Sequence, residues 1–242
     1  MKSDNVICIL AKCPNAGGVK PRLEGYLGKK EASFLARAFL LDSIATALRV
    51  TRAAIDLAFC PPEAFNEFQD IIYLFANEEE DKKISRLSQT ISLIPQSGMN
   101  LGERLANLSH HFFELKGARR VLFICSDNPV LDPVLLKAAL MLLKKSKAVL
   151  GPTFDGGFYL MGVSGHYPHI YEKIEWGGNA TYRQITEKLD SEQMKWTELE
   201  ISYDVDGPDE LEQLYCDIET LRLTGKENIC RHTEKCLANL KQ

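Results

Sequence analysis

Short apolar runs alternate along this chain with longer segments in which apolar residues recur every three or four positions. The runs are rich in β-branched residues and predict strands over residues 5–11, 54–60, 91–95, 121–125, 148–151, 158–163 and 197–201. The longer segments predict helices over residues 29–49, 132–145, 181–189 and 208–223, and from residue 100 past residue 112. Strands separated by helices are typical of βαβ units, so we predict an α/β fold with a mostly parallel sheet.

The helix over residues 29–49 has a predicted inner face. Its apolar residues are separated by four, three, four and three positions, which places them on one side of a helix. They are Phe34, Ala38, Leu41, Ala45 and Leu48. We expect this side to lie on the sheet.

Two further helices have marked starts. Asn100 and Glu103 resemble a capping box, in which two side chains satisfy free amides at the helix start. Asp132 and Pro133 suit the cap and the first position of a helix, because proline lacks only an amide hydrogen that is unpaired there anyway. The helix that begins at Asn100 has a predicted buried stripe of Leu101, Leu105, Leu108 and Phe112.

Two segments are less regular. Residues 64–88 show no clear period, and the acidic residues 78–81 predict a solvated surface turn. The residues from about 228 onward predict a peripheral helix or a frayed tail. Because no internal repeat or linker divides the chain, we predict a single domain over residues 1–242.

The composition is that of an ordinary globular protein, with 45% hydrophobic and 26% charged residues in 242. It excludes disordered and fibrous architectures. The 29 Lys and Arg against 33 Asp and Glu give a net charge of −4, which argues against a generic binder of nucleic acids or membrane surfaces. An anionic ligand must therefore be held by local groups.

The cysteines and the first apolar run bear on the cellular compartment. The seven cysteines are odd in number and include no C-x-x-C pair, which favours reduced thiols over disulfides or a zinc site. The apolar residues 6–11 are far fewer than the roughly 20 of a membrane helix, and no signal-peptide cleavage pattern follows them. We therefore expect a cytoplasmic protein without a membrane span.

The loop over residues 11–23 has the features of a phosphate cradle. Gly17 and Gly18 let the backbone approach a ligand closely, while Lys12, Lys20 and Arg22 can neutralise a di- or triphosphate. The loop matches neither the P-loop nor the dinucleotide fingerprint, which disfavours a P-loop ATPase and a Rossmann dehydrogenase. A flexible turn with solvated cations is the alternative.

Three acidic residues are candidate metal ligands. Asp127 follows an apolar strand, where a carboxylate suits Mg²⁺ or Mn²⁺, although it can also cap the turn before Pro129. Asp204 and Asp206 point the same way in an extended backbone, so one of them could share a metal with Asp127. Alternatively, Asp206 caps the helix that starts at Pro208.

Two glycine pairs are candidate acceptor sites. Asp155, Gly156 and Gly157 form either a tight hairpin or an open space in which Asp155 orients or deprotonates a hydroxyl. Trp176, which precedes the second pair at residues 177–178, either flanks an acceptor pocket or lies in the core beside a turn.

Together these segments resemble the DUF2064 proteins, which are regarded as glycosyltransferases with the nucleotide-diphospho-sugar transferase (GT-A) fold. Five motifs, among them G-x-D-x-P-x-L and D-V-D-T-P-E-D-L, occur in the family's order at residues 11–23, 96–104, 125–131, 150–162 and 204–211. The resemblance implies a Rossmann-like, three-layer α/β/α fold with a mostly parallel mixed sheet. It also implies a nucleotide bound by the first loop, with Gln96 and Arg104 as further contacts, and Mg²⁺ or Mn²⁺ near Asp127.

The sequence departs from the family pattern at several positions. Pro21 and Gly207 replace threonines, Cys125 replaces a glycine, and residues 177–178 are glycines where the family has Ser-Thr. Loss of a hydroxyl in a polar site costs about 1 to 3 kcal/mol when a partner is left unpaired, so the acceptor preference can differ. The three cations of the first loop are retained.

Three functions agree with these residues. The first is metal-assisted transfer of a glycosyl group from a nucleotide-diphosphate sugar to a small acceptor, with Lys20 and Asp155 as catalytic residues. The second is nucleotidyl transfer from a nucleoside triphosphate to a phosphorylated acceptor, which releases pyrophosphate. The third is nucleotide binding without catalysis, because a fold does not by itself imply an activity.

Overall fold

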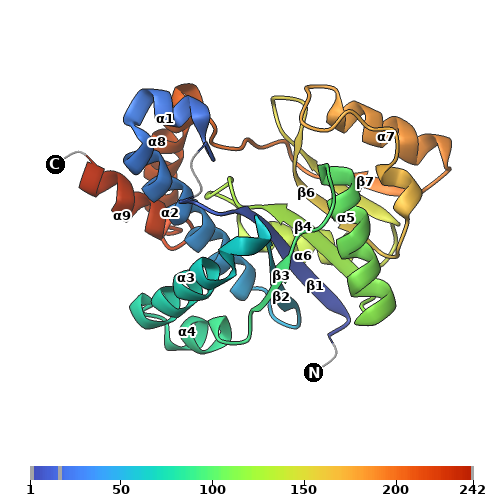
Figure 1. Ribbon diagram of the computed structural model, residues 1–242, viewed down its shortest axis with the longest axis horizontal. Helices are drawn as coiled ribbons and strands as arrows, with labels where there is room; N and C mark the ends of the chain where they lie inside the picture. The colour runs from blue at the N-terminus through green and yellow to red at the C-terminus, as the bar shows by residue number, and fades with distance from the viewer. Residues whose placement is uncertain (1–2, 16–17, 241–242) are drawn as a thin grey trace.

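The computed structural model describes residues 3–15 and 18–240 (Figure 1). Within them, seven strands form one sheet in the order β3-β2-β1-β4-β6-β5-β7. The strands are β1 Asn5–Lys12, β2 Ala54–Cys60, β3 Ser92–Pro95, β4 Arg120–Cys125, β5 Ala148–Pro152, β6 Phe158–Val163 and β7 Trp196–Glu198. Strand β6 is antiparallel to β4 and β5, and the other neighbouring strands are parallel. The predicted mostly parallel mixed sheet is confirmed.

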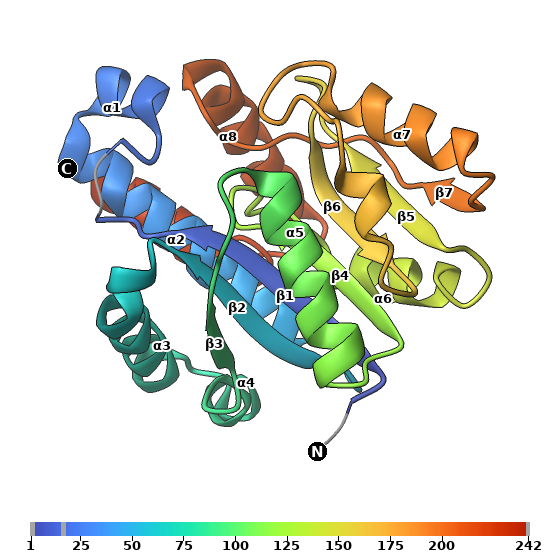
Figure 2. The same ribbon diagram turned by 45° about the vertical axis from the view of Figure 1, so that its right-hand side comes forward.

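Helices cover both faces of the sheet (Figure 2). The α-helices are α1 Pro21–Leu27, α2 Lys29–Leu48, α3 Phe65–Glu78, α4 Lys82–Ser88, α5 Leu101–His110, α6 Pro133–Leu142, α7 Thr181–Ser191, α8 Pro208–Leu223 and α9 Arg231–Leu240. Helices α2, α3, α4 and α6 pack on one face, and α5 and α7 pack on the other, as the three-layer α/β/α prediction requires. In the described parts of the chain, no helix is long and apolar enough to cross a membrane.

The central strands β1, β4, β5 and β6 are mostly apolar because both of their faces are buried. In β1, Ile7 and Ile9 pack against the α2 side, whereas Val6 and Cys8 pack against the α5 side. Successive side chains of a strand point to opposite faces, so a strand covered on both sides needs an unbroken apolar run. This is why the strands could be recognised from the sequence.

Helix α2 is buried on its outer side as well. Leu35 and Phe39 pack with Leu214 of α8 and Leu237 of α9 in a third core cluster. Figure 1 shows α1, α8 and α9 beside this helix at one end of the molecule. The predicted burial of Phe34 is wrong, since its side chain is 47% exposed. A helix that is apolar nearly all round gives no reliable inner face from spacing alone.

The irregular segment is more ordered than predicted, and the chain end forms the helix that was one of its two predicted alternatives. Residues 64–88 contain α3 and α4, and the residues after 228 form α9 instead of a frayed tail. Glu79 is buried and lies 3.6 Å from Arg231 and 3.7 Å from His232. The expectation of a solvated turn at residues 78–81 is therefore wrong for Glu79, because α9 covers it.

The predicted helix starts are confirmed. The backbone N–H of Glu103 donates to Asn100 Oδ1 at 2.9 Å, and that of Val134 donates to Asp132 Oδ1 at 2.7 Å. The helix ends are less well predicted, since α6 ends at Leu142 and α5 passes at residue 111 into a π-helical turn, His111–Leu115.

Asp42 of α2 caps the start of α9. Its Oδ1 accepts a hydrogen bond from the backbone N–H of His232 at 2.9 Å, and its Oδ2 accepts one from that of Thr233 at 2.8 Å. Burial raises the pKa of Asp42 from 3.8 to about 7, although these hydrogen bonds lower it. The packing of α9 on α2 is thereby coupled to the protonation of the Asp42 carboxyl group.

We expect Asp42→Asn to remove a pH dependence of folding stability. Between the two pKa values of Asp42 the folded chain holds a proton that the unfolded chain has lost, so the stability of the wild type falls as the pH rises towards 7. Urea denaturation at about pH 5 and about pH 8 should show a fall larger in the wild type than in the variant by roughly 1 to 3 kcal/mol. Asp70→Asn, on the exposed side of α3, is the matched control. Parallel pH profiles for the wild type and Asp42→Asn would contradict this expectation.

Candidate functional site

The segments singled out in the sequence meet at one edge of the sheet. Strands β1, β4 and β5 run in the same direction, so the loops that follow them lie at their common carboxyl end, where open α/β sheets bind ligands. Residues 204–206 lie beside the loop after β4, because the backbone N–H of Val205 donates to the carbonyl oxygen of Asp127 at 2.9 Å.

The ammonium group of Lys20 lies at the centre of this edge. Its Nζ is 2.6 Å from Asp206 Oδ1 and 2.9 Å from Asp127 Oδ2. The Lys20 side chain is only 2% exposed, whereas those of Asp127 and Asp206 are 36% and 41% exposed. One buried cation thus joins the first loop, the loop after β4 and the segment that leads into α8.

The pKa shifts of Lys20 and Asp206 agree with an ionised pair. Burial lowers the pKa of Lys20, but Asp127 and Asp206 outweigh it and the net shift is upward. Burial raises the pKa of Asp206, but Lys20 outweighs it and the net shift is downward. The lysine therefore stays charged and Asp206 stays a carboxylate at neutral pH.

Asp204 differs from its two acidic neighbours. Its Oδ1 is buried and has no hydrogen-bond partner among the described residues. Burial and the charge of Asp127 raise the pKa of Asp204 well above its usual range, against the effect of Lys20. Asp204 therefore favours its protonated form.

The three acidic residues predicted as metal ligands fit a divalent cation only in part. In residues 3–15 and 18–240, no group of three His, Cys, Asp or Glu side chains is arranged to hold a metal ion, so Asp127, Asp204 and Asp206 do not form a ready three-ligand site. Mg²⁺, however, needs only one or two carboxylates when substrate phosphates supply other ligands. Asp127 and Asp206 are partly exposed, and each contacts Lys20 through one oxygen. Their other oxygens have more distant partners, since Asp127 Oδ1 lies 3.4 Å from Ser126 Oγ and Asp206 Oδ2 lies 3.8 Å from Arg22, and a cation would share them.

The alternative role of Asp206 as a helix cap is not observed. The N-cap of α8 is Gly207, and no side chain caps the helix. Pro21, another departure from the family pattern, is the first residue of α1, where a proline is well tolerated. The Cys125 thiol donates to the carbonyl oxygen of Phe158 at 3.5 Å, and burial, Asp204 and Asp127 raise its pKa, so it remains a thiol.

The exposed cations of the first loop are Lys12 and Arg22. The terminal nitrogens of Arg22 lie 3.8 Å from Asp206 and 3.7 Å from Glu210, and its side chain is mostly exposed. Gly18 has a positive φ of 66°, which favours glycine. The predicted phosphate contact at Gly17 lies outside the described residues.

Gln96 and Arg104 support the backbone near this edge. Gln96 is buried, and its Nε2 donates to the carbonyl oxygen of Ala58 at 2.7 Å. The Nε of Arg104 donates to the carbonyl oxygen of Gly98 at 3.2 Å. Both side chains thus hold protein backbone at the carboxyl end of the sheet, and their predicted contact with a nucleotide remains a prediction.

Asp155 is fixed by its own loop. Its Oδ1 accepts hydrogen bonds from Thr153 Oγ1 at 2.5 Å and from the backbone N–H of Gly157 at 3.0 Å. Because both bonds end on Oδ1, Oδ2 is the oxygen that can accept a proton or a hydrogen bond from a substrate.

Gly156 and Gly157 serve close packing. Gly156 has a φ of +86°, and a Cβ atom there would lie 1.9 Å from the carbonyl oxygen of Asn179. A Cβ atom at Gly157 would lie 3.0 Å from Thr153 Oγ1. Protein atoms therefore occupy the space beside both glycines, and the loop is held against residues 178–182.

Trp176 is partly buried and packs against the core cluster on the α5 side of the sheet. Its ring lies edge-on to Phe158, with centroids 6.4 Å apart, and a Cβ atom at Gly102 would lie 2.4 Å from its Nε1. This placement matches the core alternative weighed from the sequence. It also explains Gly102, whose place in the motif at residues 96–104 carried no predicted role.

A cavity of about 560 Å³ opens next to Asp155. We refer to it as the acidic cavity. It lies between the start of α8, the loop after β5 and residues 201–204, and Arg22 and Val130 complete its wall. Both Asp155 and Asp204 line the cavity. Because Asp204 is two residues from Asp206, the cavity adjoins the ion pairs of Lys20.

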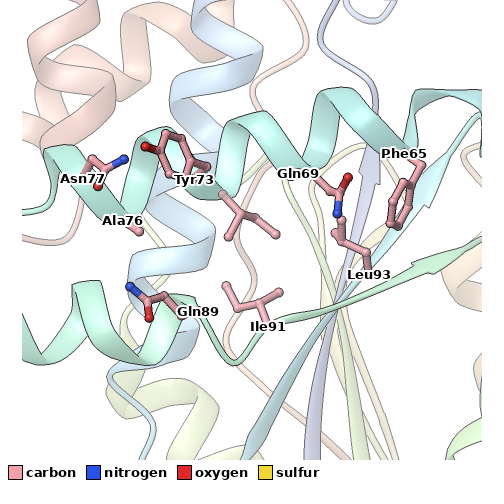
Figure 3. A pocket seen from close by; sticks show the side chains of 9 residues that line it. Phe65, Gln69, Tyr73, Ala76, Asn77, Gln89, Ile91 and Leu93 are labelled. Atoms are coloured by element: carbon pink, nitrogen blue, oxygen red, sulfur yellow. The ribbon is translucent and has the colours of Figure 1, made fainter.

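A second cavity, of about 470 Å³, lies at the β3 edge of the sheet, between α3 and residues 89–93, which lead from α4 into β3 (Figure 3). Its side chains are apolar or uncharged, with Phe65, Tyr73, Gln69, Asn77 and Gln89 among them. None of the predicted site residues lines it. Of these two cavities, the acidic cavity is therefore the one that is lined by predicted site residues.

Sequence reasoning missed a residue that supports the first loop. Glu67 of α3 accepts a hydrogen bond from the Cys13 thiol at 2.7 Å and another from the Asn15 amide. It lies in the segment that lacked a clear helical period, and no sequence signal marked it. The loop is thus supported by a helix from the edge of the sheet.

We expect Lys20→Met to destabilise the fold by about 2 to 4 kcal/mol, because two carboxylates lose their buried partner. Equilibrium urea denaturation measures this loss. Arg22→Met is the control, since an exposed ion pair contributes at most about 1 kcal/mol. The double variant Lys20→Met/Asp206→Asn should lose less than the sum of the single losses. Equal losses for Lys20→Met and Arg22→Met would contradict the central role of Lys20.

We expect Gly156→Ala to destabilise the fold by roughly 3 kcal/mol, through a clash with the Asn179 backbone and an unfavourable φ. The matched control is Gly225→Ala, where φ is +69° and no atom lies within 4 Å, so about 1 kcal/mol is expected. Thermal unfolding compares the two variants. Similar losses would show that the close approach at Gly156 is not a packing constraint.

Comparisons with known proteins agree with this architecture. Residues 63–178 match the model of the family DUF2064, described as an uncharacterized protein conserved in bacteria. The motifs at residues 96–104, 125–131 and 150–162 lie within the matched region. No curated protein matches the chain.

The solved structures that are similar to this chain include three that bear on its function. A crystal structure described as a "putative nucleotide-diphospho-sugar transferase" from Desulfovibrio desulfuricans has a TM-score of 0.80 and 26% identity and covers 98% of each chain. A CMP:2-keto-3-deoxy-manno-octonic acid synthetase complexed with CTP has a TM-score of 0.55 and 13% identity over 89% of this chain and 98% of its own. A Mycobacterium tuberculosis protein in complex with manganese has a TM-score of 0.51 and 12% identity over 88% of this chain and 98% of its own.

The last two structures share the fold alone, whereas the first is similar in sequence as well. Together with the family match, it confirms the resemblance that the motifs predicted: residues 63–178 match the DUF2064 model, and the chain has a fold like that of a structure described as a putative nucleotide-diphospho-sugar transferase.

Proposed function

We propose that this chain transfers a glycosyl group from a nucleotide-diphosphate sugar to a small acceptor. The observation that carries the proposal is the buried Lys20 ammonium between Asp127 and Asp206, at the carboxyl end of the sheet and next to a cavity lined by Asp155. The similarity to the Desulfovibrio desulfuricans structure over 98% of both chains supports it.

The nucleotide side of the site is assigned to the first loop. Lys12 and Arg22 are exposed cations there, and they would neutralise the diphosphate through charge-assisted hydrogen bonds. Because the ammonium of Lys20 is taken up by two carboxylates, we assign Lys20 a positioning role in place of the direct catalytic role expected from the sequence.

Asp127 and Asp206 would hold Mg²⁺ or Mn²⁺. Each has a carboxylate oxygen that Lys20 does not use, and both side chains are partly exposed. When bound, such an ion would stabilise the negative charge of the leaving diphosphate as a Lewis acid. The manganese complex of a protein with the same fold supports this choice of ion.

Asp155 would act on the acceptor. The acceptor oxygen forms a bond to the anomeric carbon of the sugar, and the bond between that carbon and the diphosphate oxygen breaks. The hydroxyl proton passes to Asp155 Oδ2, and the nucleoside diphosphate leaves with the bonding electrons. Thr153 and the Gly157 backbone hold Asp155 in place for this transfer.

Nucleotidyl transfer is the second candidate. The observation that favours it is the likeness in fold to a synthetase complexed with CTP. The same cations would then assist attack of a phosphorylated acceptor on the α-phosphorus of a nucleoside triphosphate, with release of pyrophosphate. The two functions differ in their products.

We expect nucleotide-diphosphate sugars to raise the stability of the wild type only when Mg²⁺ or Mn²⁺ is present. A ligand at 100 times its dissociation constant adds about 2.7 kcal/mol, which thermal unfolding detects. Asp127→Ala should lose this stabilisation, whereas Asp70→Ala on α3 should keep it. A panel of nucleotide-diphosphate sugars and nucleoside triphosphates, each with and without metal, identifies the donor.

The products then decide between the two candidates. Release of a nucleoside diphosphate supports glycosyl transfer, and release of pyrophosphate supports nucleotidyl transfer instead. Metal-dependent stabilisation that survives in Asp127→Ala would refute the assigned metal ligand. No stabilisation by any nucleotide would refute both functions.

A further inference from the structure

The lining of the acidic cavity is dominated by carboxyl groups. They belong to Asp155, Asp204, Asp209, Glu210 and Asp217. Among the described residues, the one cation that lines the cavity is Arg22, whose terminal nitrogens already lie near Asp206 and Glu210. The cavity therefore carries a net negative charge.

The start of α8 does not offset this charge. The first turn of a helix normally attracts anions, because its free amides and the helix dipole present positive charge. Here Asp209 and Glu210 occupy that turn and face the same cavity. A phosphate group that entered would meet carboxylates at the place where a helix start usually binds it.

Two oxygens of the lining lack hydrogen-bond donors. Asp204 Oδ1 and Glu210 Oε2 are buried and have no hydrogen-bond partner in the part of the chain that the structure describes. Asp217, in contrast, accepts hydrogen bonds from the Tyr203 hydroxyl at 2.6 Å and from Gln213 at 3.0 Å. Glu210 Oε2 is therefore an acceptor without a donor beside this cavity, and an ionised phosphate has no O–H or N–H group to supply one.

The remaining lining is apolar. Val130, Phe154 and Ile201 contribute hydrocarbon surface, and both Phe154 and Ile201 are exposed. Apolar walls with a few polar groups are typical of small-molecule sites, in which the walls hold the carbon skeleton and the polar groups orient it. A sugar ring or a short alkyl chain with donor groups matches this pattern.

We propose that the acidic cavity binds the acceptor and selects an uncharged or cationic molecule with hydroxyl or amino groups over a phosphorylated one. The inference rests on the proposed glycosyl transfer, since it assigns the acceptor of that reaction. It separates the two candidate functions, because nucleotidyl transfer as considered above needs a phosphorylated acceptor.

The test compares three compounds that share one ring and differ in charge: glucosamine, glucose and glucose 6-phosphate. Their binding to the full chain is measured by ligand-observed NMR without nucleotide, so that it does not depend on the donor. Glucosamine should bind at least about fivefold more tightly than glucose 6-phosphate, with glucose between them. Asp209→Asn should weaken glucosamine binding about twofold to fivefold and leave glucose binding unchanged, as expected for one exposed charge.

Glu212→Gln is the matched control, because Glu212 lies on the exposed side of α8 and does not line the cavity. It should leave the binding of all three compounds unchanged. A preference for glucose 6-phosphate, equal binding of the three compounds, or no binding by any of them overturns the inference. Failure of the proposed function is separate from this, since it would appear as absence of nucleotide-dependent stabilisation.

Discussion

A lysine ammonium that is removed from water must be paired, and the site depends on how Lys20 meets this requirement. Burial of an unpaired charge costs several kcal/mol, so Lys20 is tolerated only because Asp127 and Asp206 both contact it. These carboxylates come from the loop after β4 and from the segment that leads into α8, which are distant in sequence from the first loop. The ion pairs therefore fix the relative positions of the segments that carry the candidate chemistry, and they orient α8, whose first turn lines the acidic cavity.

The sequence was sufficient for the elements whose signals are local. Buried strands such as β1 are continuous apolar runs, and the starts of α5 and α6 are set by side chains within three residues of the amides they cap. Elements that depend on distant contacts were harder to predict. Glu79 looks like part of a solvated turn until α9 covers it, and the outer side of α2 is recognisable as buried only once α8 and α9 are in place.

The same distinction applies to the candidate site. Its residue types and their order could be predicted, because carboxylates and cations after strands indicate phosphate and metal chemistry in any α/β sheet. Their partners could not, since Lys20 with Asp206, Gly156 with Asn179, and Gly102 with Trp176 each join distant parts of the chain. As a result, glycines that suggested open space for a ligand prove to be points of close packing, and the acidic cavity had no counterpart in any single motif.

The charge around Lys20 gives a physical reason for combining a lysine with two potential metal ligands. Two carboxylates and one ammonium leave a single net negative charge, which attracts a divalent cation more strongly than a neutral group would and less strongly than two bare carboxylates would. A divalent cation bound there would make this net charge positive, which would suit a diphosphate. The acidic cavity next to it would stay negative, so an anionic group would be favoured at the metal and disfavoured at the proposed acceptor site. A donor with a diphosphate and an acceptor without a phosphate would thereby be directed to different parts of one site, which is the arrangement that glycosyl transfer requires.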